Sequence, residues 1–526
     1  MAALEREYVL GSFCELRITT SLSSTQLSKV TLRKTAEDDD DASTTSAAAR
    51  AEVFGTELIA GVPVHLPPGR SLSIFTSTGC TLLLVAPPTV LQRCYATSLG
   101  TTWVRSLLDL HSHLERARVE ARASGDVGPR VLFVSDRHHC GASTYARWLG
   151  NFAVRLGYHP LLLDGVPDTP AFALPGSIGL FHLQHTVDIE EEMNLTPVLC
   201  APLGQTRAAN PRLYQHWLRQ LLPHGLEKMA RSERCRIGGL FFDFGVVEPH
   251  AVEVAEVAAA AAGSGGEGAA FIAPPPASHG GDKALAHPLD ALIDTIVAAD
   301  IDHVCVIGSS WLRWKLVQRA WYRFGGEGTM EVAQAMLDPR WAVPSEVDCG
   351  GGQHFKLLLL DAVELTRSVP VPLWKRQRWL QYFFGTPTSP VRPTLVTLEA
   401  AQVRVASVGA AALEAMSTLL PMMDGDDADA QKSDGTAVSF VTLHDVALKD
   451  RIVAISTATE YERDATRELH RLPFSVFERN TRQGTVRGFA LVESATPERL
   501  TLLLSGCSLD KELGLCFLLT EEELKS

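Results

Sequence analysis

Between residues 131 and 307, short apolar segments alternate with segments of helical character. The apolar segments are residues 131–134, 160–163, 179–182, 238–244 and 302–307. Strands that are apolar on both faces are typical of a parallel sheet that helices cover on both sides. The sequence therefore predicts an α/β central domain. Leucines at helical spacing also predict a helix over residues 106–125.

The two flanking regions have a different pattern. Over residues 1–105, short alternating runs separated by Gly, Pro and Ser predict a small β-sandwich, and the chain is β-rich again from about residue 390. We expect three domains, at residues 1–105, 106–388 and 389–526. Low-complexity composition predicts a disordered insert at about 258–288, and polar or acidic composition predicts loops at 36–49 and 424–435.

Composition limits the possible classes of protein. A net charge of −13 argues against unaided, non-specific nucleic-acid binding, although it leaves room for a local basic groove. No apolar run approaches the ~18 residues of a membrane span, so we expect no membrane association. Ten cysteines without a CxxC pair indicate reduced thiols rather than disulfides or zinc. We interpret His111 and His113 as surface residues of the helix, not as metal ligands.

The segment at residues 131–157 has the layout of a phosphate-binding P-loop, GxxxxGK[ST]: an apolar strand, a polar turn and an amphipathic helix. Gly141, Ser143 and Thr144 can supply backbone amides, a helix N-terminus and a hydroxyl group for magnesium. However, Asp136 occupies the first glycine position and Ala142 the lysine position. Taken alone, the segment is a weak signal and fits an ordinary strand-to-helix turn better.

Several strings in order along the chain resemble the Clp-one family, the polyribonucleotide 5′-hydroxyl kinases and pre-mRNA cleavage-factor subunits. They include "AEVFGTEL" at residues 51–58, "FTSTGCTL" at 75–82, "NFAVRLGYHP" at 151–160, "LPGSIGL" at 174–180 and "RWLQYFFG" at 378–385. The resemblance implies an α/β P-loop NTPase-like central domain flanked by an N-terminal β-sandwich and a C-terminal β-rich domain. It also implies ATP and Mg as cofactors and residence in the nucleus. The implied partners are a Pcf-eleven-type cleavage-factor subunit and other 3′-end processing proteins, with RNA bound indirectly or weakly.

The resemblance also assigns site residues. The positions equivalent to the family's ATP contacts are Glu15, Ser71, His139, Cys140, Gly141, Ala142, Ser143 and Thr144. Ser143 would hold Mg if nucleotide binds. The chain departs from the family at the two loop positions already named. It also has Val166 where the family has a catalytic Asp, and Ser77 where the family has a tryptophan facing adenine.

Two hypotheses follow from these departures. The first is a non-catalytic or weakly catalytic scaffold subunit of the pre-mRNA 3′-end cleavage and polyadenylation machinery, with ATP absent, weak or structural. Loss of one preorganised charge often lowers a rate by roughly 10²–10³, so loss of both the lysine and the Asp should leave little phosphoryl transfer. The second is an active RNA 5′-kinase, acting also in tRNA splicing. There Asp164 or Asp168 would replace the catalytic Asp, and Arg137 or Arg207 the lysine.

Overall fold

The computed structural model describes residues 3–22, 27–33, 49–98, 102–191, 197–203, 207, 210–263, 287–323, 345–348, 354–363, 369–409, 436–441, 443, 448–464, 467–506 and 509–524. The chain forms two compact units. The first unit comprises Met1–Leu163, His182–Asn194 and Glu227–Val369. The second comprises Asp164–Phe181, Leu195–Leu226 and Pro370–Ser526. We describe each unit separately.

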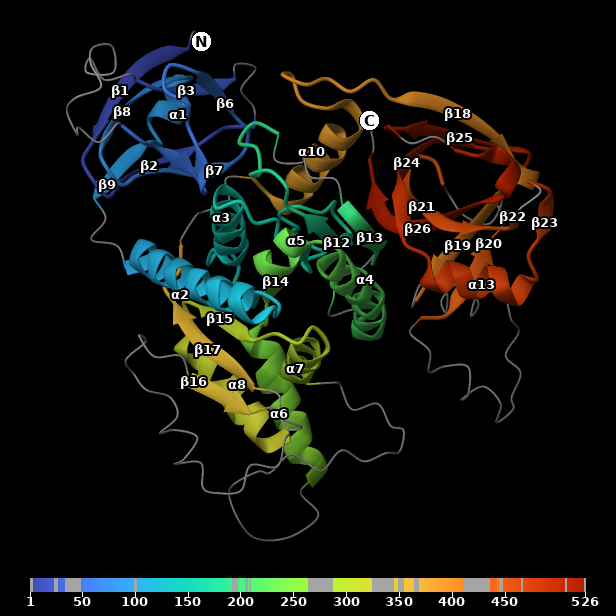
Figure 1. Ribbon diagram of the computed structural model, residues 1–526. Coiled ribbons are helices and arrows are strands. Elements are labelled where there is room, and N and C mark those ends of the chain that lie inside the picture. Colours follow the sequence, from blue (N-terminus) through green and yellow to red (C-terminus); the bar gives the residue numbers. More distant parts are fainter. Residues whose placement is uncertain are drawn as a thin grey trace. The chain divides into compact units, whose positions relative to one another are not determined.

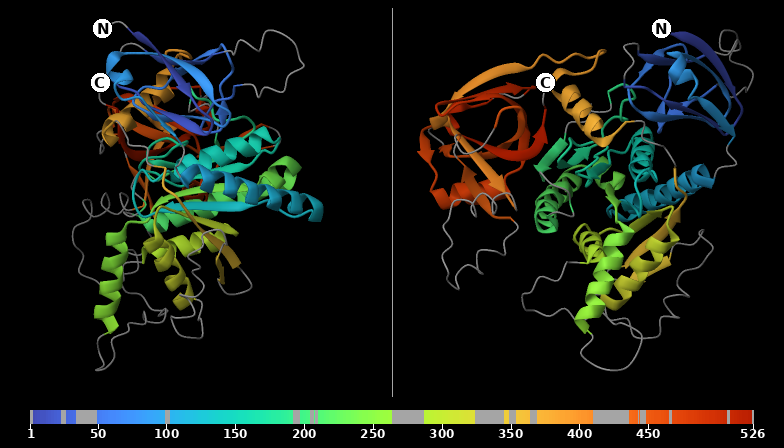
Figure 2. Two further views of the ribbon diagram at one scale, coloured as in Figure 1. Left: turned by 90° about the vertical axis from the view of Figure 1, so that its left-hand side faces the viewer. Right: turned by 180° about the vertical axis from the view of Figure 1, so that it is seen from behind.

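The first unit begins with the expected β-sandwich, which Figures 1 and 2 show in blue. One sheet has the strand order β1-β8-β3-β6 and the other the order β5-β4-β7-β2-β9. The strands are β1 (Leu4–Leu10), β2 (Cys14–Thr19), β3 (Ser28–Leu32), β4 (Glu52–Val53), β5 (Thr56–Glu57), β6 (Pro63–Leu66), β7 (Ser71–Thr76), β8 (Cys80–Ala86) and β9 (Tyr95–Ser98). Alternate residues of β8 are buried, which is the burial pattern expected of a sandwich strand.

The first unit also contains most of the α/β region. Its part of the central sheet has the order β11-β14-β10-β15-β17-β16. Strands β10, β14, β15 and β17 are parallel, as expected, whereas β16 pairs with β17 antiparallel. These strands are β10 (Arg130–Ser135), β11 (Leu161–Asp164), β14 (Leu240–Val246), β15 (His303–Ile307), β16 (Ser345–Asp348) and β17 (His354–Leu360).

Helices pack against this sheet. Helix α3 contacts β10 and β14, whereas α8 contacts β15 and β17. Figure 1 labels the helices of this region, which are α2 (Thr102–Ser124), α3 (Ala142–Arg155), α5 (Glu233–Gly238), α6 (Pro249–Gly263), α7 (Pro288–Ala298) and α8 (Ser310–Arg323). None of the helices in the described part of the chain has both the length and the apolarity needed to cross a membrane. The eight described cysteines are all thiols.

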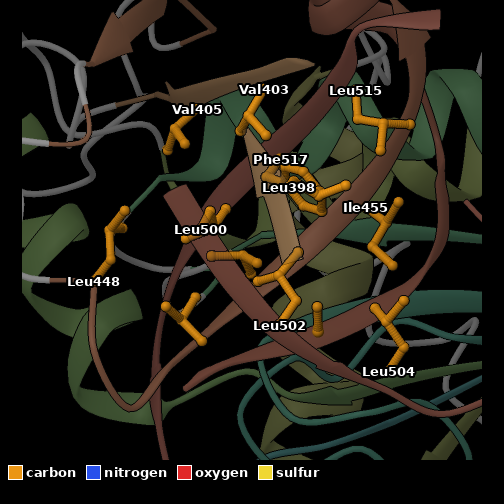
Figure 3. Close-up of a cluster of buried hydrophobic side chains, with 13 residues drawn as sticks. Leu398, Val403, Val405, Leu448, Ile455, Leu500, Leu502, Leu504, Leu515 and Phe517 are labelled. Carbon is orange, nitrogen blue, oxygen red and sulfur yellow. The ribbon is translucent and has the colours of Figure 1, made fainter. Parts of the chain in front are cut away.

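The second unit contains the C-terminal β-rich region. A seven-stranded sheet has the order β18-β25-β24-β21-β26-β19-β20, and alternate side chains of its strands form a common apolar core (Figure 3). Its strands are β18 (Thr394–Glu399), β19 (Val403–Val408), β20 (Val438–Val441), β21 (Arg451–Thr459), β24 (Val486–Ala495), β25 (Arg499–Leu504) and β26 (Leu515–Glu523). The unit also holds the antiparallel pair β12 (Ser177–His182) and β13 (Pro197–Pro202), except that His182 belongs to the first unit. It further contains the hairpin β22 (Tyr461–Arg463) and β23 (Leu469–Arg471), and the helices α10 (Val371–Phe384) and α13 (Phe474–Gln483).

Helix α6 corrects one expected boundary. It continues to Gly263, so residues 258–263 of the predicted disordered insert are helical. These residues are mostly alanine, which has the highest helix propensity, and that explains the extension. Residues 264–286, nearly all of the predicted loop at 36–49 and the whole loop at 424–435 lie outside the described residues.

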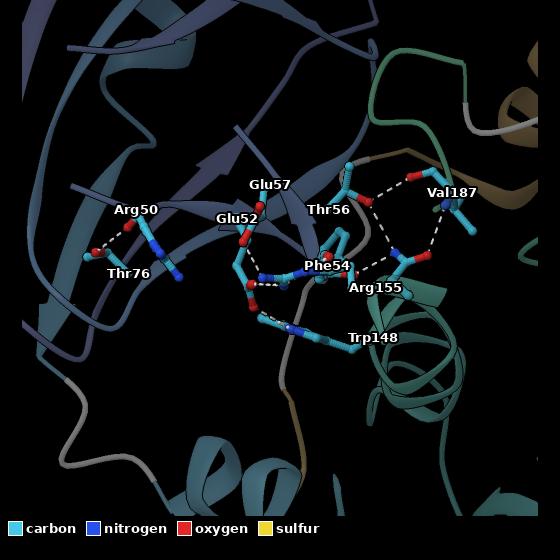
Figure 4. Close-up of polar contacts among 11 residues, drawn as sticks. Arg50, Glu52, Phe54, Thr56, Glu57, Thr76, Trp148, Arg155 and Val187 are labelled. Atoms are coloured by element: carbon cyan, nitrogen blue, oxygen red, sulfur yellow. Dashed lines mark hydrogen bonds and ion pairs between the residues drawn. The ribbon is translucent and has the colours of Figure 1, made fainter. Parts of the chain in front are cut away.

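A tight turn joins the sandwich to helix α3 (Figure 4). Strands β4 and β5 are connected by Phe54 and Gly55, both with positive φ, which is the two-residue hairpin turn matched to strand twist. Asn151 Nδ2 donates to the Phe54 carbonyl at 2.8 Å and to Thr56 Oγ1 at 3.1 Å. The Trp148 indole donates to Glu52 Oε1 at 2.9 Å. The turn therefore fixes the sandwich on the helix that begins at the P-loop-like segment.

Gly55 should be irreplaceable in this turn. Its φ is +84°, and a Cβ would lie 3.0 Å from Trp148 Cδ1 and from the Trp148 carbonyl oxygen. Gly157 is a matched control, because its φ is +85° and a Cβ there would meet nothing within 4 Å. We expect Gly157→Ala to lower the free energy of unfolding by about 1–2 kcal/mol through backbone strain alone. Gly55→Ala should lower it by about 1–3 kcal/mol more through overpacking. Urea unfolding measures both, and equal losses would contradict docking through this turn.

Candidate nucleotide-binding site

The loop between β10 and α3 ends in a glycine with positive φ at the N-terminus of the helix. Gly141 precedes α3 with φ of 100°, and no side chain caps the helix N-terminus. A Cβ at Gly141 would lie 2.8 Å from the Cβ of Val363, so the position requires glycine. Cys140 is tied to the same residue, because its carbonyl accepts a hydrogen bond of 2.8 Å from the Val363 amide. The loop is thus held by contacts within the protein.

Asp136, at the start of this loop, is bound to the neighbouring strand-to-helix turn. Its Oδ2 accepts a hydrogen bond of 2.5 Å from Ser309 Oγ. Ser309 Oγ in turn accepts from the amide of Leu312 at 3.0 Å, as a cap of α8. Oδ1 of Asp136 is buried and has no hydrogen-bond partner among the described residues. A negative charge is therefore fixed at the entrance to the loop.

The position that a lysine occupies in a working P-loop carries no positive charge in this chain. Ala142 is buried at the first position of α3, with 8% of its surface exposed. Ser143 and Thr144 are half-buried and offer hydroxyl groups. Arg137 and His139 are exposed, His139 adopts φ of 65°, and the Arg137 guanidinium donates to Cys140 Sγ at 3.2 Å.

These residues do not fit a tightly bound nucleoside triphosphate. Backbone amides and hydroxyl groups remain, but the β- and γ-phosphates need a cation that Ala142 cannot provide. The carboxylate of Asp136 adds a like charge that would oppose phosphate binding. The loop therefore has the shape of a phosphate site without its electrostatics.

The structure places the two expected sandwich residues in neighbouring strands. Glu15 is fully buried in β2, between β7 and β9, where Arg17 Nε donates to it at 2.7 Å and Ser73 Oγ at 2.5 Å. Glu15 is therefore not a surface acid at a strand edge. Ser71 is half-buried, with its Oγ 3.2 Å from Thr19 Oγ1. Contact of either residue with ATP stays a prediction.

The two candidate acids of the kinase hypothesis lie in the second unit. Asp164 is fully buried, and its carboxylate accepts hydrogen bonds from the amides of Val166, Phe172 and Ala173 at 3.2, 2.7 and 3.0 Å. Burial raises the pKa of Asp164, whereas these amides act to lower it. A carboxylate that shapes its own loop and is closed to solvent is suited to a structural role rather than to proton transfer. Asp168 and Val166 are half-buried.

The other candidates from the sequence lie on several different elements. Arg207 lies over the Tyr214 ring at 5.6 Å in the second unit, and Ser77 is exposed on the sandwich. His111 and His113 lie on α2 as expected, but they are half-buried rather than fully exposed. His111 packs against Phe152 with ring centroids 4.8 Å apart, and His113 Nε2 lies 2.9 Å from His303 Nε2. Burial lowers the pKa of both histidines, for His113 to about 4.

Asp243 is a candidate residue that sequence reasoning missed. It is fully buried in β14, directly beside Phe133 of the strand that leads into the loop, and its Oδ1 accepts from the Gly245 amide at 3.1 Å. In P-loop NTPases, an Asp following a neighbouring strand helps to hold Mg. The signal was present in the sequence as a single acid within the apolar run "LFFDFG".

Comparison with known families covers the sandwich and much of the α/β region. The N-terminal beta-sandwich domain of polyadenylation factor matches residues 14–121. The family described as mRNA cleavage and polyadenylation factor CLP1 P-loop matches residues 137–261. The sandwich and the P-loop domain expected from the sequence are thereby confirmed.

Individual CLP1 proteins are also similar to this chain in sequence. The chain is 31% identical over 195 residues to a "Protein CLP1 homolog" of Nematostella vectensis, covering 36% of this chain and 44% of that protein. It is 34% identical over 185 residues to the "Polyribonucleotide 5′-hydroxyl-kinase Clp1" of Xenopus tropicalis, covering 35% and 41%. The matched part thus spans less than half the length of these relatives.

Solved structures extend the likeness of the fold to the whole chain. A structure of the wild-type Clp1p–Pcf11p complex has a TM-score of 0.67 with 16% identity, covering 99% of both chains. A second structure, of an extended interface between Pcf11p and Clp1p, has a TM-score of 0.66 with 16% identity and the same coverage. Residues 14–121 and 137–261 of the chain therefore match the CLP1 family, and the whole chain shares the fold of Clp1p.

Proposed function

We propose that this protein is a non-catalytic CLP1-type scaffold subunit of the pre-mRNA 3′-end cleavage and polyadenylation machinery. The observation that carries the proposal is the charge of the loop. Ala142 supplies no cation at the lysine position, and Asp136 holds a carboxylate at the loop entrance through Ser309. The backbone geometry around Gly141 persists because it packs against Val363, which requires no nucleotide.

The proposal includes partners and location. The structural neighbours are Clp1p bound to Pcf11p, which supports a Pcf11-type cleavage-factor subunit as a partner of this chain. A role in pre-mRNA cleavage supports residence in the nucleus. RNA would then reach the protein within a larger assembly rather than as a substrate of the loop. The likeness to 5′-hydroxyl kinases supports ATP and Mg only as weak or structural ligands.

The alternative, an active polyribonucleotide 5′-hydroxyl kinase that also acts in tRNA splicing, rests on the printed name of relatives such as the Xenopus protein. The local environments favour it less. Asp164 already accepts three backbone hydrogen bonds in a fully buried position. Arg207 lies over Tyr214, and the Arg137 guanidinium bonds Cys140 within the loop.

A kinase assay decides between the two functions. The purified chain is incubated with ATP, Mg and an RNA oligonucleotide that carries a 5′-hydroxyl group, and 5′-phosphate formation is measured. We expect no transfer above that of a heat-denatured sample, because the charge that stabilises the transferred phosphoryl group is missing. Transfer with a rate in the normal range of a kinase, about 1–100 s⁻¹, would overturn the scaffold proposal.

Restoring the charge should restore nucleotide binding before any catalysis. Asp136→Gly with Ala142→Lys removes the like charge and adds the cation that reaches the β- and γ-phosphates. We expect millimolar ATP to raise the melting temperature of this double variant and to leave that of the native chain unchanged. The control is Asp136→Gly with Ala142→Met, which adds similar bulk without charge. An equal shift in the native chain would contradict the assigned loss of electrostatics.

The contact between Asp136 and Ser309 should stabilise the native loop without nucleotide. In a double-mutant cycle, Asp136→Ala, Ser309→Ala and the double variant are unfolded with urea. Because the hydrogen bond has a charged acceptor, we expect a coupling free energy of about 1–3 kcal/mol. Additive losses would mean that the two side chains do not depend on each other. Ser309→Thr, which keeps the hydroxyl group, should retain most of the coupling.

A further inference from the structure

A cluster of cationic and imidazole side chains lies at the edge of the central sheet opposite the P-loop-like segment. The loop follows the end of β10, and β14 runs parallel to β10. The Leu161 amide at the start of β11 bonds the Gly239 carbonyl just before β14, so both strands begin at the far edge. His159 precedes β11 at this edge, and its amide bonds the carbonyl of Arg234 at 3.0 Å.

We define the basic rim by five residues of the first unit, which are His159, His182, His185, Lys228 and Arg234. The rings of His159 and His182 lie 5.8 Å apart at an angle of 75°. Burial, followed by the charges of Lys228 and His159, lowers the pKa of His182 to about 4. Burial, followed by the charges of Arg234 and His185, lowers the pKa of His159. Lys228 thus acts on the His182 ring, and Arg234 acts on the His159 ring.

The positive charge of the rim is not neutralised locally. Arg231, on the last turn of the helix that precedes α5 in the chain, is paired with Glu227. Within the described part of the chain, the side chains of Lys228 and Arg234 have no ion-pair partner. Arg234 and His185 are exposed, and His159, His182 and Lys228 are half-buried. Lys228 and Arg234 are therefore cations without an ion pair among the described residues, half-buried and exposed respectively, in a protein whose net charge is −13.

We propose that the basic rim binds the sugar-phosphate backbone of single-stranded RNA. Lys228 and Arg234 have the charge that contacts phosphate oxygens. The His159 and His182 rings lie beside them, and aromatic faces next to cations are the combination on which bases of a single strand stack. An acidic peptide would use the cations but not the rings. The choice of RNA rests on the proposed function in RNA 3′-end processing.

The test measures binding of a fluorescein-labelled single-stranded RNA to the full chain by anisotropy, over a series of salt concentrations. Lys228→Gln with Arg234→Gln removes two cations of the rim. The control, Arg499→Gln with Lys511→Gln, makes the same change in net charge at residues that bond Glu399 and the Thr397 carbonyl. We expect the rim variant to bind about tenfold more weakly and its log–log salt slope to fall by about 1.4, which is ~0.7 per lost phosphate contact. The control should bind like the native chain.

A second variant tests the role of the rings. His159→Gln with His182→Gln should weaken RNA binding severalfold while leaving the binding of inorganic polyphosphate unchanged, because polyphosphate has no bases to stack. Thermal melts of all variants establish that they fold. The proposal is overturned if the rim variant and the control bind RNA equally, or if polyglutamate competes as well as RNA of the same length. Neither result bears on the kinase assay. If the basic rim does not bind RNA, the proposed absence of catalysis is therefore unaffected.

Discussion

The position of the loop depends on the face of α3 that packs against the β4–β5 turn. Trp148, Asn151 and Arg155 are spaced at three and four residues, so they lie on one side of the helix. Asn151 is fully buried and uses both ends of its amide, since its Nδ2 donates to the Phe54 carbonyl and its Oδ1 accepts from the Val187 amide at 2.9 Å. A buried amide with satisfied partners fixes a single arrangement, because any shift leaves polar groups without bonds. The helix that begins at the loop is thus fixed without a ligand.

Because of this packing, the shape of the loop does not depend on the charges that would bind phosphate. Gly141 is required because a Cβ would meet Val363, and Cys140 is tied to the same residue. Neither constraint involves a phosphate group. In contrast, the loop position that contributes only charge in a working P-loop is held here by Ala142. A glycine at the right spacing therefore indicates the fold of this region, whereas binding must be inferred from the charged side chains around it.

The sequence predicts the elements that depend on a local pattern of residues. It does not predict burial or contacts that depend on residues far away in the chain. Periodicity located β10, β14 and β15 and predicted the sandwich, because each of these signals lies within a short stretch of neighbouring residues. Burial of His113 could not be predicted, since its partner His303 is 190 residues away. The same holds for Glu15, whose neighbour Ser73 lies 58 residues along the chain. The charges of the loop residues could be predicted from the sequence. The contact between Asp136 and Ser309 could not, because 173 residues separate the two side chains.

The net charge of this protein and the charge at the basic rim lead to different conclusions about the binding of polyanions. A total of −13 opposes binding of polyanions to the surface as a whole. Salt limits that opposition, because charges more than about 8–10 Å apart are largely screened at physiological ionic strength. At the basic rim, the cations that act on His159 and His182 are Arg234 and Lys228. The acidic remainder of the chain would then confine a polyanion to the rim instead of preventing its binding. The two places thus differ: at the loop Asp136 opposes phosphate, whereas at the basic rim Lys228 and Arg234 would attract it.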